Sequence, residues 1–339
     1  MKIRLKTFLS IFPFTVFMSN RKTSLTGVPS VQERFLIITA DDFGASENIN
    51  EGIKIAADKK SITTISVLSN FTESLSQLKY ISESHPDIGI GVHLNITTGK
   101  PLLGAERVPS LVDANGNFYT IEALLPKITS ISIEDLRKEL RAQIIALVNY
   151  DIRLDHLSDQ NGIISLYTPF FDILMELAKE FDLPVRTPVV ASVKYHDVFA
   201  NSEMNRRGRQ IGLRLALTHP FKSIRLFKYS GINEMTKKVQ KLDERKILHP
   251  DLLIDSFWGN PTAANFLHIL ENLPKGVSEI MIHCGTNIRQ ENYPSGLDQD
   301  YFRDRENELI TITSDYLKEY FSFLNIKNIG YSDILNDKE

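Results

Sequence analysis

Short apolar runs alternate with amphipathic stretches along most of this 339-residue chain. The apolar runs have the length of buried strands, and they lie at residues 35–40, 62–68, 88–95, 152–158, 183–187, 278–283 and 327–331. Between them, apolar residues recur at the spacing of one helix face, for example over 49–56 and 136–147. Strands that alternate with helices predict an α/β fold with a parallel sheet, either a (β/α) barrel or an open doubly wound sheet.

The first apolar run ends in two adjacent carboxylates, Asp41 and Asp42, within the sequence FLIITADDFG. A buried carboxylate is costly unless it pairs with a cation or holds a metal. Capping of the next helix accounts for at most one of them, because Ser46 is better placed before a helix that begins near Glu47. Successive strand side chains point to opposite faces, so both aspartates can reach one site only where the strand breaks into a loop.

Two histidines lie at the ends of other predicted strands. In IGIGVHLNIT, alternation places His93 on the same face as Gly89 and Gly91, and we expect these glycines to leave space beside it. In EIMIHCG, His283 ends another apolar run. Parallel strands bring their carboxyl ends to one rim, so an aspartate pair and two histidines predict a metal site with acid and base groups. Cys284 points to the opposite strand face from its neighbour and is expected to be a packing residue.

Composition and charge narrow the classes of partner. The formal net charge of -3 and the pI near 6.3 give no electrostatic case for nucleic acid or an acidic membrane surface, so small or neutral partners are favoured. A single cysteine excludes an internal disulfide framework and a multi-cysteine zinc site. A homodimer is compatible with these numbers.

The N-terminus is the only indication of compartment. A basic start, MKIRLK, precedes an apolar run at residues 8–18 that is too short to span a bilayer and is typical of a signal peptide. No small-x-small cleavage site follows it, and an N-terminal extension of a cytoplasmic protein is the alternative to export into the periplasm or medium. In both cases residues 1–32 lie outside the predicted domain, residues 33–339, which contains no candidate membrane segment.

Several segments together resemble one family. TADDFGASENINEGI, GVHLNITTGKPL, DLPVRTP, LPKGVSEIMIHCG and YFRDRENEL, in this order, are similar to motifs of the YdjC-like carbohydrate deacetylases. The resemblance covers roughly residues 33–335. It implies an irregular (β/α) barrel of the NodB-like deacetylase type and a divalent metal, Mg²⁺ or Zn²⁺. The implied reaction is removal of acetyl groups from N-acetylated sugars or oligosaccharides.

The resemblance also implies roles for individual residues. Asp41 would be the general base, and Asp42 and His93 would be metal ligands. His283 would be the general acid, although Cys284 replaces a proline of the family motif. Two further residues would bind the substrate, Arg186 and Asn95.

One departure from the family pattern concerns the remaining metal ligand. Where the family has a histidine-rich run, this chain has DHLSDQNGIIS, residues 155–165. His156 aligns with the first family histidine, but Gln160 stands where the ligand histidine is expected, and an amide oxygen is a weaker zinc ligand than imidazole. Three alternatives follow: a third ligand among His156, Asp159 and Gln160, a harder and better hydrated metal, or an impaired site.

Two other function classes stay open. A metal on a barrel rim does not specify the bond that is broken, so the substrate could be an ester or a phosphoester. A carbohydrate-binding pseudoenzyme is the second alternative, because of Gln160.

Residues 192–250 match the family poorly and are predicted to form an insertion near the rim. Its basic run, residues 205–214, is interpreted as a solvated helix face rather than a site for an anionic substrate.

Overall fold

The computed structural model describes residues 33–229, 232–286 and 299–336, so the candidate signal segment, residues 1–32, lies outside the described residues. The described strands are β1 (Arg34–Phe43), β2 (Thr64–Val67), β3 (Gly89–Leu94), β4 (Leu157–Asp159), β5 (Leu252–Ile254), β6 (Gly276–Ile282) and β7 (Ile326–Asn328). The described α-helices are α1 (Glu47–Asp58), α2 (Leu75–Ser84), α3 (Ile121–Leu124), α4 (Ile133–Asn149), α5 (Ile163–Leu166), α6 (Thr168–Glu180), α7 (Ala191–Lys194), α8 (Ser202–Thr218), α9 (Pro220–Phe227), α10 (Ile232–Glu244), α11 (Ala263–Glu271), α12 (Gln299–Ile312), α13 (Asp315–Phe323) and α14 (Tyr331–Asn336).

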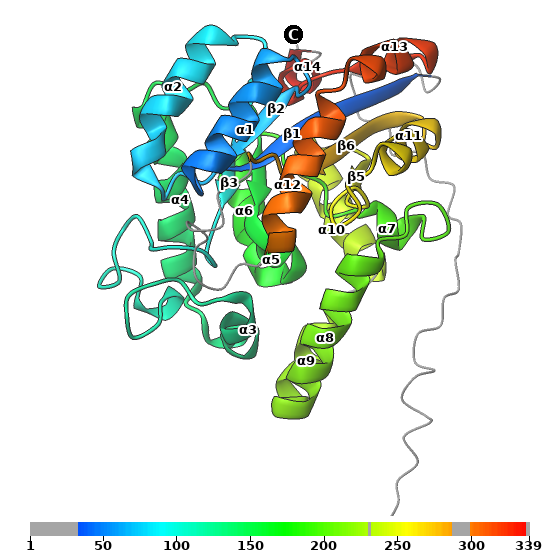
Figure 1. Cartoon of the computed structure of the whole chain (residues 1–339). Helices are drawn as coiled ribbons and strands as arrows, with labels where there is room; N and C mark the ends of the chain where they lie inside the picture. Colours follow the sequence, from blue (N-terminus) through cyan, green and yellow to red (C-terminus); the bar gives the residue numbers. More distant parts are fainter. Residues whose placement is uncertain (1–32, 230–231, 287–298, 337–339) are drawn as a thin grey trace, which may run out of the picture.

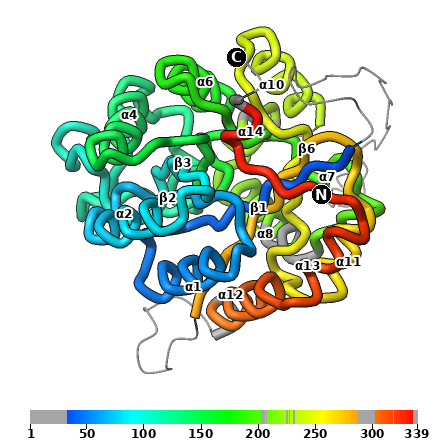
Figure 2. Tube along the Cα trace, turned by 90° about the horizontal axis from the view of Figure 1, so that it is seen from above, coloured from blue at the N-terminus to red at the C-terminus, as the bar shows by residue number. Residues whose placement is uncertain are grey.

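The strands form one parallel sheet that curves into a barrel. Their order is β4-β3-β2-β1-β6-β5, and β7 pairs with the first residues of β1. The two edge strands are connected through residues 184–190, where Val185 bridges to β4 and Val190 bridges to β5. This confirms the predicted irregular (β/α) barrel, whose helices lie outside the strands (Figures 1 and 2).

The segment 183–187 closes the barrel without becoming a regular strand. It contains Pro184 and is followed by Pro188, and proline has no N–H to donate to a sheet. The remaining backbone bonds divide between neighbours, because Val185 N donates to Leu248 O and Arg186 N donates to Leu157 O. This part of the barrel wall is therefore an irregular segment, and Arg186 lies within it.

Side chains of β1 show why the barrel has a polar mouth. Leu36, Ile38 and Ala40 point outward into the main apolar core, which the helices complete. Phe35 and Ile37 point inward and form a small apolar cluster with Val277 of β6 and Tyr331 of α14. The next inward positions of β1 are polar, Thr39 and Asp41. The interior therefore changes from an apolar floor to a charged mouth along one strand.

Most predicted elements are confirmed. Helix α1 begins at Glu47 with Ser46 as its N-cap, and α1 and α4 cover the two predicted amphipathic stretches. Strand β5, only three residues long, was not predicted, and β4 begins at Leu157, near the end of the expected run. Helices α7 to α10 lie within the predicted insertion. No helix of the described residues has the length and apolarity needed to cross a bilayer.

The glycines before His93 make room for other residues than expected. A Cβ on Gly91 would lie 2.2 Å from the ring of His156, and one on Gly89 would lie 1.7 Å from Asp155 Oδ2. The expectation that they clear space beside His93 was wrong. The chain from β4 passes so close to β3 that only glycine fits.

We predict that Gly91→Ala lowers the free energy of unfolding by about 1–3 kcal/mol, the usual cost of overpacking. The His156 ring cannot move aside, because it is fully buried and stacks on Tyr331 with ring centroids 4.3 Å apart. Gly208→Ala in α8 is the control, since no atom lies within 4 Å of the added Cβ. Urea denaturation measures both variants, and equal midpoints for the two would contradict this packing.

Candidate functional site

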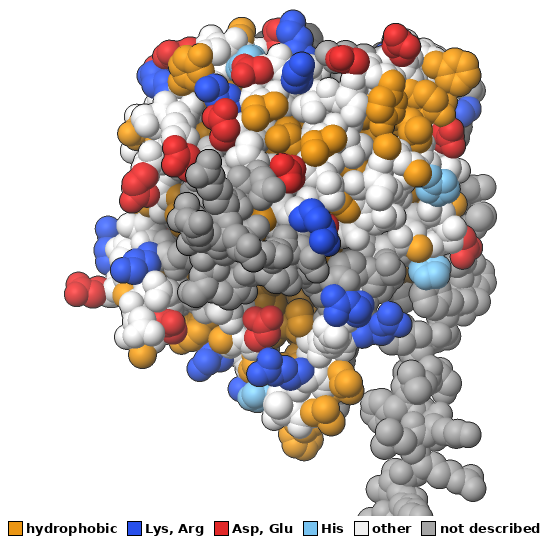
Figure 3. All heavy atoms as spheres, in the orientation of Figure 1, with side chains coloured by type: hydrophobic (Ala, Val, Ile, Leu, Met, Phe, Trp, Pro, Cys, Tyr) orange, Lys and Arg blue, Asp and Glu red, His pale blue; other side chains and the backbone are white. Residues whose placement is uncertain are grey.

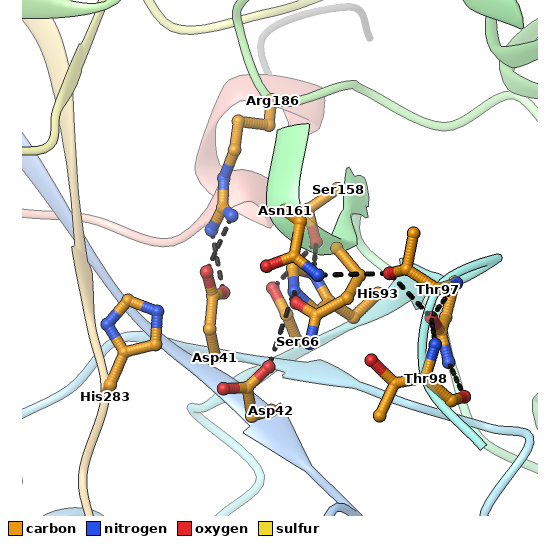
Figure 4. A network of polar contacts seen from close by, with 12 residues as sticks. Asp41, Asp42, Ser66, His93, Thr97, Thr98, Ser158, Asn161, Arg186 and His283 are labelled. Carbon is orange, nitrogen blue, oxygen red and sulfur yellow. Dashed lines mark hydrogen bonds and ion pairs between the residues drawn. The ribbon is translucent and has the colours of Figure 1, made fainter. Parts of the chain in front are cut away.

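A β-bulge turns two successive aspartates toward the barrel mouth. In the pairing of β1 with β2, Ala40 lies opposite Ile65, whereas Phe43 lies opposite Val67, so β1 contains one extra residue. Asp42 has a φ of 73°, in the left-handed region that a residue with a side chain rarely adopts. The bulge breaks the alternation of side chains, and Asp41 and Asp42 lie side by side (Figure 4). The expected break into a loop was wrong, because β1 continues to Phe43 and the two aspartates are brought together by a bulge within it.

Asp41 is held by a buried guanidinium group. Its Oδ2 accepts a hydrogen bond from Arg186 Nη1 at 2.7 Å, and its Oδ1 accepts one from Nη2 at 2.8 Å. Burial raises the pKa of Asp41, but Arg186 and His93 together outweigh burial and hold this pKa well below its ordinary value. Asp41 is therefore ionised at neutral pH.

Arg186 also binds a second carboxyl group deeper in the barrel. Its Nε and Nη2 donate to Glu279 Oε1 at 3.1 and 2.8 Å. The same oxygen accepts from Thr39 Oγ1 at 2.6 Å, and Glu279 Oε2 accepts from Tyr331 Oη at 2.7 Å. The side chain that was expected to face the substrate thus connects the mouth of the barrel to its floor.

Asp42 lies between a cation and a histidine. Arg305 of α12 donates through Nη2 to Asp42 Oδ2, and Asp42 Oδ1 lies 3.7 Å from His93 Nε2. Burial raises the pKa of Asp42, but Arg305, followed by His283 and His93, lowers it overall. Within the described part of the chain, Asp42 Oδ1 is buried and has no hydrogen-bond partner. One oxygen of this carboxylate is therefore open toward His93.

His93 begins a chain of buried hydrogen bonds that runs down the inner barrel wall. Its Nδ1 lies 2.8 Å from Ser158 Oγ, Ser158 Oγ donates to Ser66 Oγ at 2.9 Å, and Ser66 Oγ lies 3.0 Å from His156 Nε2. His156 Nδ1 lies 2.6 Å from Asp155 Oδ1. Gln160 Oε1 lies 2.9 Å from His93 Nε2, and because an amide oxygen only accepts hydrogen bonds, Nε2 is the donor in this contact.

The positions predicted for the third ligand differ in depth. His156 is joined to His93 only through the two serines and is not brought next to Asp42. Asp159 accepts hydrogen bonds from the N–H groups of Ile164 and Ser165 and so caps the start of the following helical turns. Gln160 alone reaches the mouth, with Oε1 2.9 Å from His93 Nε2.

His283 lies at the other side of the aspartate pair (Figure 4). Its backbone N–H donates to Glu308 Oε2 at 2.5 Å, and its ring Nδ1 lies 3.9 Å from the same oxygen. Burial and the nearby Arg305 lower the pKa of His283 to about 4. Burial raises the pKa of Glu308 to about 8. At neutral pH the His283 ring is therefore neutral and Glu308 is largely protonated.

Asn95 uses its side chain to shape the loop after β3. Its Oδ1 accepts from the N–H groups of Thr97 and Thr98, and its Nδ2 donates to Thr98 O and Asn70 Oδ1. Substrate binding by Asn95 stays a prediction, and the observed bonds give it a role in forming the wall of the mouth. Cys284 is fully buried in the apolar core, and burial raises the pKa of its thiol, which confirms it as a packing residue.

The donor set for a metal is partly present. Asp42 Oδ1 faces His93 Nε2 and is buried without a hydrogen-bond partner among the described residues. His93 Nε2 contacts Gln160 Oε1, so the imidazole would have to give up its Nε2 proton to bind a cation. The 3.7 Å between Asp42 Oδ1 and His93 Nε2 is close to the span of two ligands that lie about 2.1 Å from one cation. No group of three or more His, Cys, Asp or Glu side chains suited to a metal exists within the described residues. A cation here would depend on Gln160 and water for its other ligands.

Two contributors to the site were missed in the sequence. Arg305 was contained in the quoted motif YFRDRENEL, but the helix that carries it gave no sign of pairing with Asp42. Glu279 interrupts an otherwise apolar strand, VSEIMI, and a charged residue at an inward position of a buried strand is the signal that could have identified it.

Comparisons with known proteins agree on one family. The family model described as YdjC-like protein matches residues 35–322. A carbohydrate deacetylase of Brevibacillus brevis is 26% identical over 307 residues, which cover 88% of this chain and 99% of the relative. A carbohydrate deacetylase of Clostridium beijerinckii is 28% identical over 304 residues, 90% of this chain and 99% of the relative.

One solved structure is similar to this chain in fold. The chain superimposes with a TM-score of 0.69 on a protein of Enterococcus faecalis described as a cellobiose-phosphate cleavage protein. The two are 22% identical, and the match covers 89% of this chain and 99% of that one.

We predict that Arg186→Leu lowers the free energy of unfolding by about 3–5 kcal/mol, because it leaves the carboxylates of Asp41 and Glu279 buried without their cation. Arg137→Leu is the matched control. Arg137 pairs with Glu176 at the surface, and its loss should change stability by at most about 1 kcal/mol. Both changes are measured by urea denaturation, and a loss for Arg186→Leu no larger than the control would refute the structural role of the buried pair.

Proposed function

The chain belongs to the YdjC-like protein family, and from this we propose that it is a carbohydrate deacetylase that hydrolyses the acetamido group of N-acetylated sugars or oligosaccharides. The observation that carries the proposal is the bulge at Asp42. It places two carboxylates side by side at the barrel mouth, one bound to Arg186 and one open toward His93.

We propose that Asp42 and His93 hold a divalent cation, Mg²⁺ or Zn²⁺, with Gln160 as the third protein contact. The cation would polarise the amide carbonyl and make a bound water more acidic. Charge supports this assignment. Three carboxyl groups, those of Asp41, Asp42 and Glu279, share two guanidinium groups in the same buried region, so a further cation balances them.

Asp41 is proposed as the general base. Its pairing with Arg186 keeps it ionised, and each carboxylate oxygen retains a second lone pair that can accept a proton from water. The low pKa makes Asp41 a weak base by itself, so the attacking water must be acidified for the transfer to be efficient. Arg186 fixes both oxygens and so orients the acceptor.

His283 is proposed to protonate the departing amine. It lies on the opposite side of Asp41 from His93, and its Nδ1 is buried without a hydrogen-bond partner among the described residues. Burial beside Arg305 holds the pKa of His283 near 4, so its ring is neutral when the reaction begins. His283 therefore has to receive the proton that Asp41 takes from water and then pass it to the amine. The proton that water loses and the proton that the amine gains balance over one cycle, and the products are acetate and the free amino sugar.

A carbohydrate-binding protein without turnover is the second candidate. It is favoured by Gln160 in place of a histidine and by Arg305 on the second oxygen of Asp42. An ester or phosphoester substrate is the third, and acetyl esters and phosphoesters belong in the same substrate panel.

We predict that Asp41→Asn retains bound metal and lowers the turnover of N-acetylated chitooligosaccharides by about 10²- to 10⁴-fold, the usual value of a positioned general base. The measurement is acetate release, together with metal content of the purified protein. Asp58→Asn, an exposed acid on α1, is the control and should leave both quantities unchanged. Full activity in Asp41→Asn would remove this residue as the base. No acetate release from any substrate by the wild type would favour the binding protein.

We predict that Gln160→His tightens Zn²⁺ binding by about tenfold or more, because even a residue that only hydrogen-bonds to a metal ligand changes metal affinity by about that factor. The Gln160 side chain already contacts His93 Nε2, so imidazole at this position can reach the same cation. Calorimetric titration with Zn²⁺ compares the variant with Gln210→His, an exposed change on α8. An affinity equal to the wild type would place the third contact elsewhere.

A further inference from the structure

The helical hairpin formed by α8 and α9 projects from the barrel on the side of α3 and the loops that follow β3 (Figure 1). One face of the hairpin serves folding, because Leu215 and Leu226 are buried in the main core. A second set of apolar side chains points into solvent. Leu213, Leu217 and Phe221 are 63%, 75% and 83% exposed. Packing among the described residues gives no reason for these three side chains.

The three exposed residues form a continuous apolar tip. Leu213 and Leu217 are one helical turn apart, and Phe221 follows directly after the turn between the helices. Figure 3 shows apolar side chains at the lower end of the molecule with basic side chains beside them. An apolar cluster at a projecting tip marks a surface that contacts another partner.

The hairpin is also strongly basic, although the whole chain has a formal net charge of -3. Residues 202–228 contain a single acidic residue, Glu203, and the exposed cations include Arg214 and Lys222 next to the apolar tip. The basic residues of this segment are Arg206, Arg207, Arg209, Arg214, Lys222, Arg225 and Lys228. The charge of the chain is therefore separated, with a cationic hairpin on an acidic body.

The combination of an apolar tip and basic flanks distinguishes among three kinds of partner: a second copy of the chain, nucleic acid and a membrane. A second copy of the hairpin would bring two clusters of positive charge together, which opposes self-association. Nucleic acid would match the charge but leave Leu213, Leu217 and Phe221 unburied. A bilayer with anionic lipids matches both the positive charge and the exposed apolar side chains. Leucine and phenylalanine enter the acyl boundary, while lysine and arginine contact the headgroups.

The hairpin is anchored to the barrel, so a contact at its tip also orients the barrel. Helix α9 packs against residues 125–130, and Ser223 of this helix is buried. Helix α10, which follows, is held by Lys238, whose Nζ donates to the backbone oxygens of Ser165 and Leu166 at 2.7 and 2.8 Å.

We propose that the α8–α9 hairpin is a docking element for an anionic membrane surface, with Leu213, Leu217 and Phe221 inserted and Arg214 and Lys222 against the lipid headgroups. The hairpin extends from the same side of the barrel as the loops around the site. Docking therefore turns the mouth of the barrel toward the lipid surface. This inference does not depend on the reaction proposed above.

Co-sedimentation of the full chain with vesicles tests the proposal. Vesicles of equal parts phosphatidylcholine and phosphatidylglycerol should bind the protein, and vesicles of pure phosphatidylcholine should bind it at least about 25-fold more weakly, given about fivefold for each cation lost from a headgroup. Arg214→Glu with Lys222→Glu should weaken binding to the anionic vesicles by about the same factor. Leu217→Ser with Phe221→Ser should weaken it by about tenfold or more.

Matched variants control for loss of charge and of exposed apolar area elsewhere. Lys59→Glu with Lys179→Glu makes the same change in net charge on other helices, and Phe323→Ser removes an aromatic ring that is 80% exposed on α13. Both should bind as the wild type does, and residues 1–32 are common to all variants.

Three results would overturn the proposal. Hairpin variants that bind the vesicles as well as the wild type would remove the hairpin as the docking element. Tighter binding to a DNA duplex than to anionic vesicles would assign the basic face to nucleic acid. A dimer in solution that Phe221→Ser dissociates would assign the apolar tip to a second copy.

Discussion

The buried ion pair between Arg186 and Asp41 is the contact on which the polar mouth of the barrel depends. A guanidinium group supplies several donors in one plane, so Arg186 satisfies two carboxyl groups, Asp41 above it and Glu279 below it. Without this cation, the buried polar side chains that follow the apolar floor along β1 would have no charge partner. The same contact keeps Asp41 ionised in a place where burial alone would favour its neutral form.

The bulge at Asp42 provides the second constraint. A regular strand would direct Asp42 into the outer core beside Ala40, where no cation lies among the described residues. A left-handed residue at this point costs on the order of 1–3 kcal/mol and persists only where its surroundings compensate for it. Here Arg305 compensates on one carboxylate oxygen, and the other oxygen remains open toward His93. Strain and an open buried oxygen at the same residue indicate a position kept for binding.

Local periodicity predicted a parallel α/β sheet, and the family resemblance implied that this sheet is an irregular barrel. The meeting of Asp41, Asp42, His93 and His283 could be predicted because it depends on where strands end. The sequence could not predict the partners that come from distant turns of the chain. Arg305 lies 263 residues from Asp42, and its contact arises from how α12 packs on the barrel. The reason given for Gly89 and Gly91 was wrong, since the residues that need the space are Asp155 and His156, just before β4. Strand β5 was missed because three residues carry too little pattern.

We propose above all that the open oxygen of Asp42 and the Nε2 of His93 together hold a cation. Anomalous diffraction from crystals soaked with Zn²⁺ tests this most directly. We expect a peak about 2.0–2.2 Å from both atoms, within reach of the Gln160 side chain. A peak at another cluster, or none at this pair at saturating Zn²⁺, would contradict it.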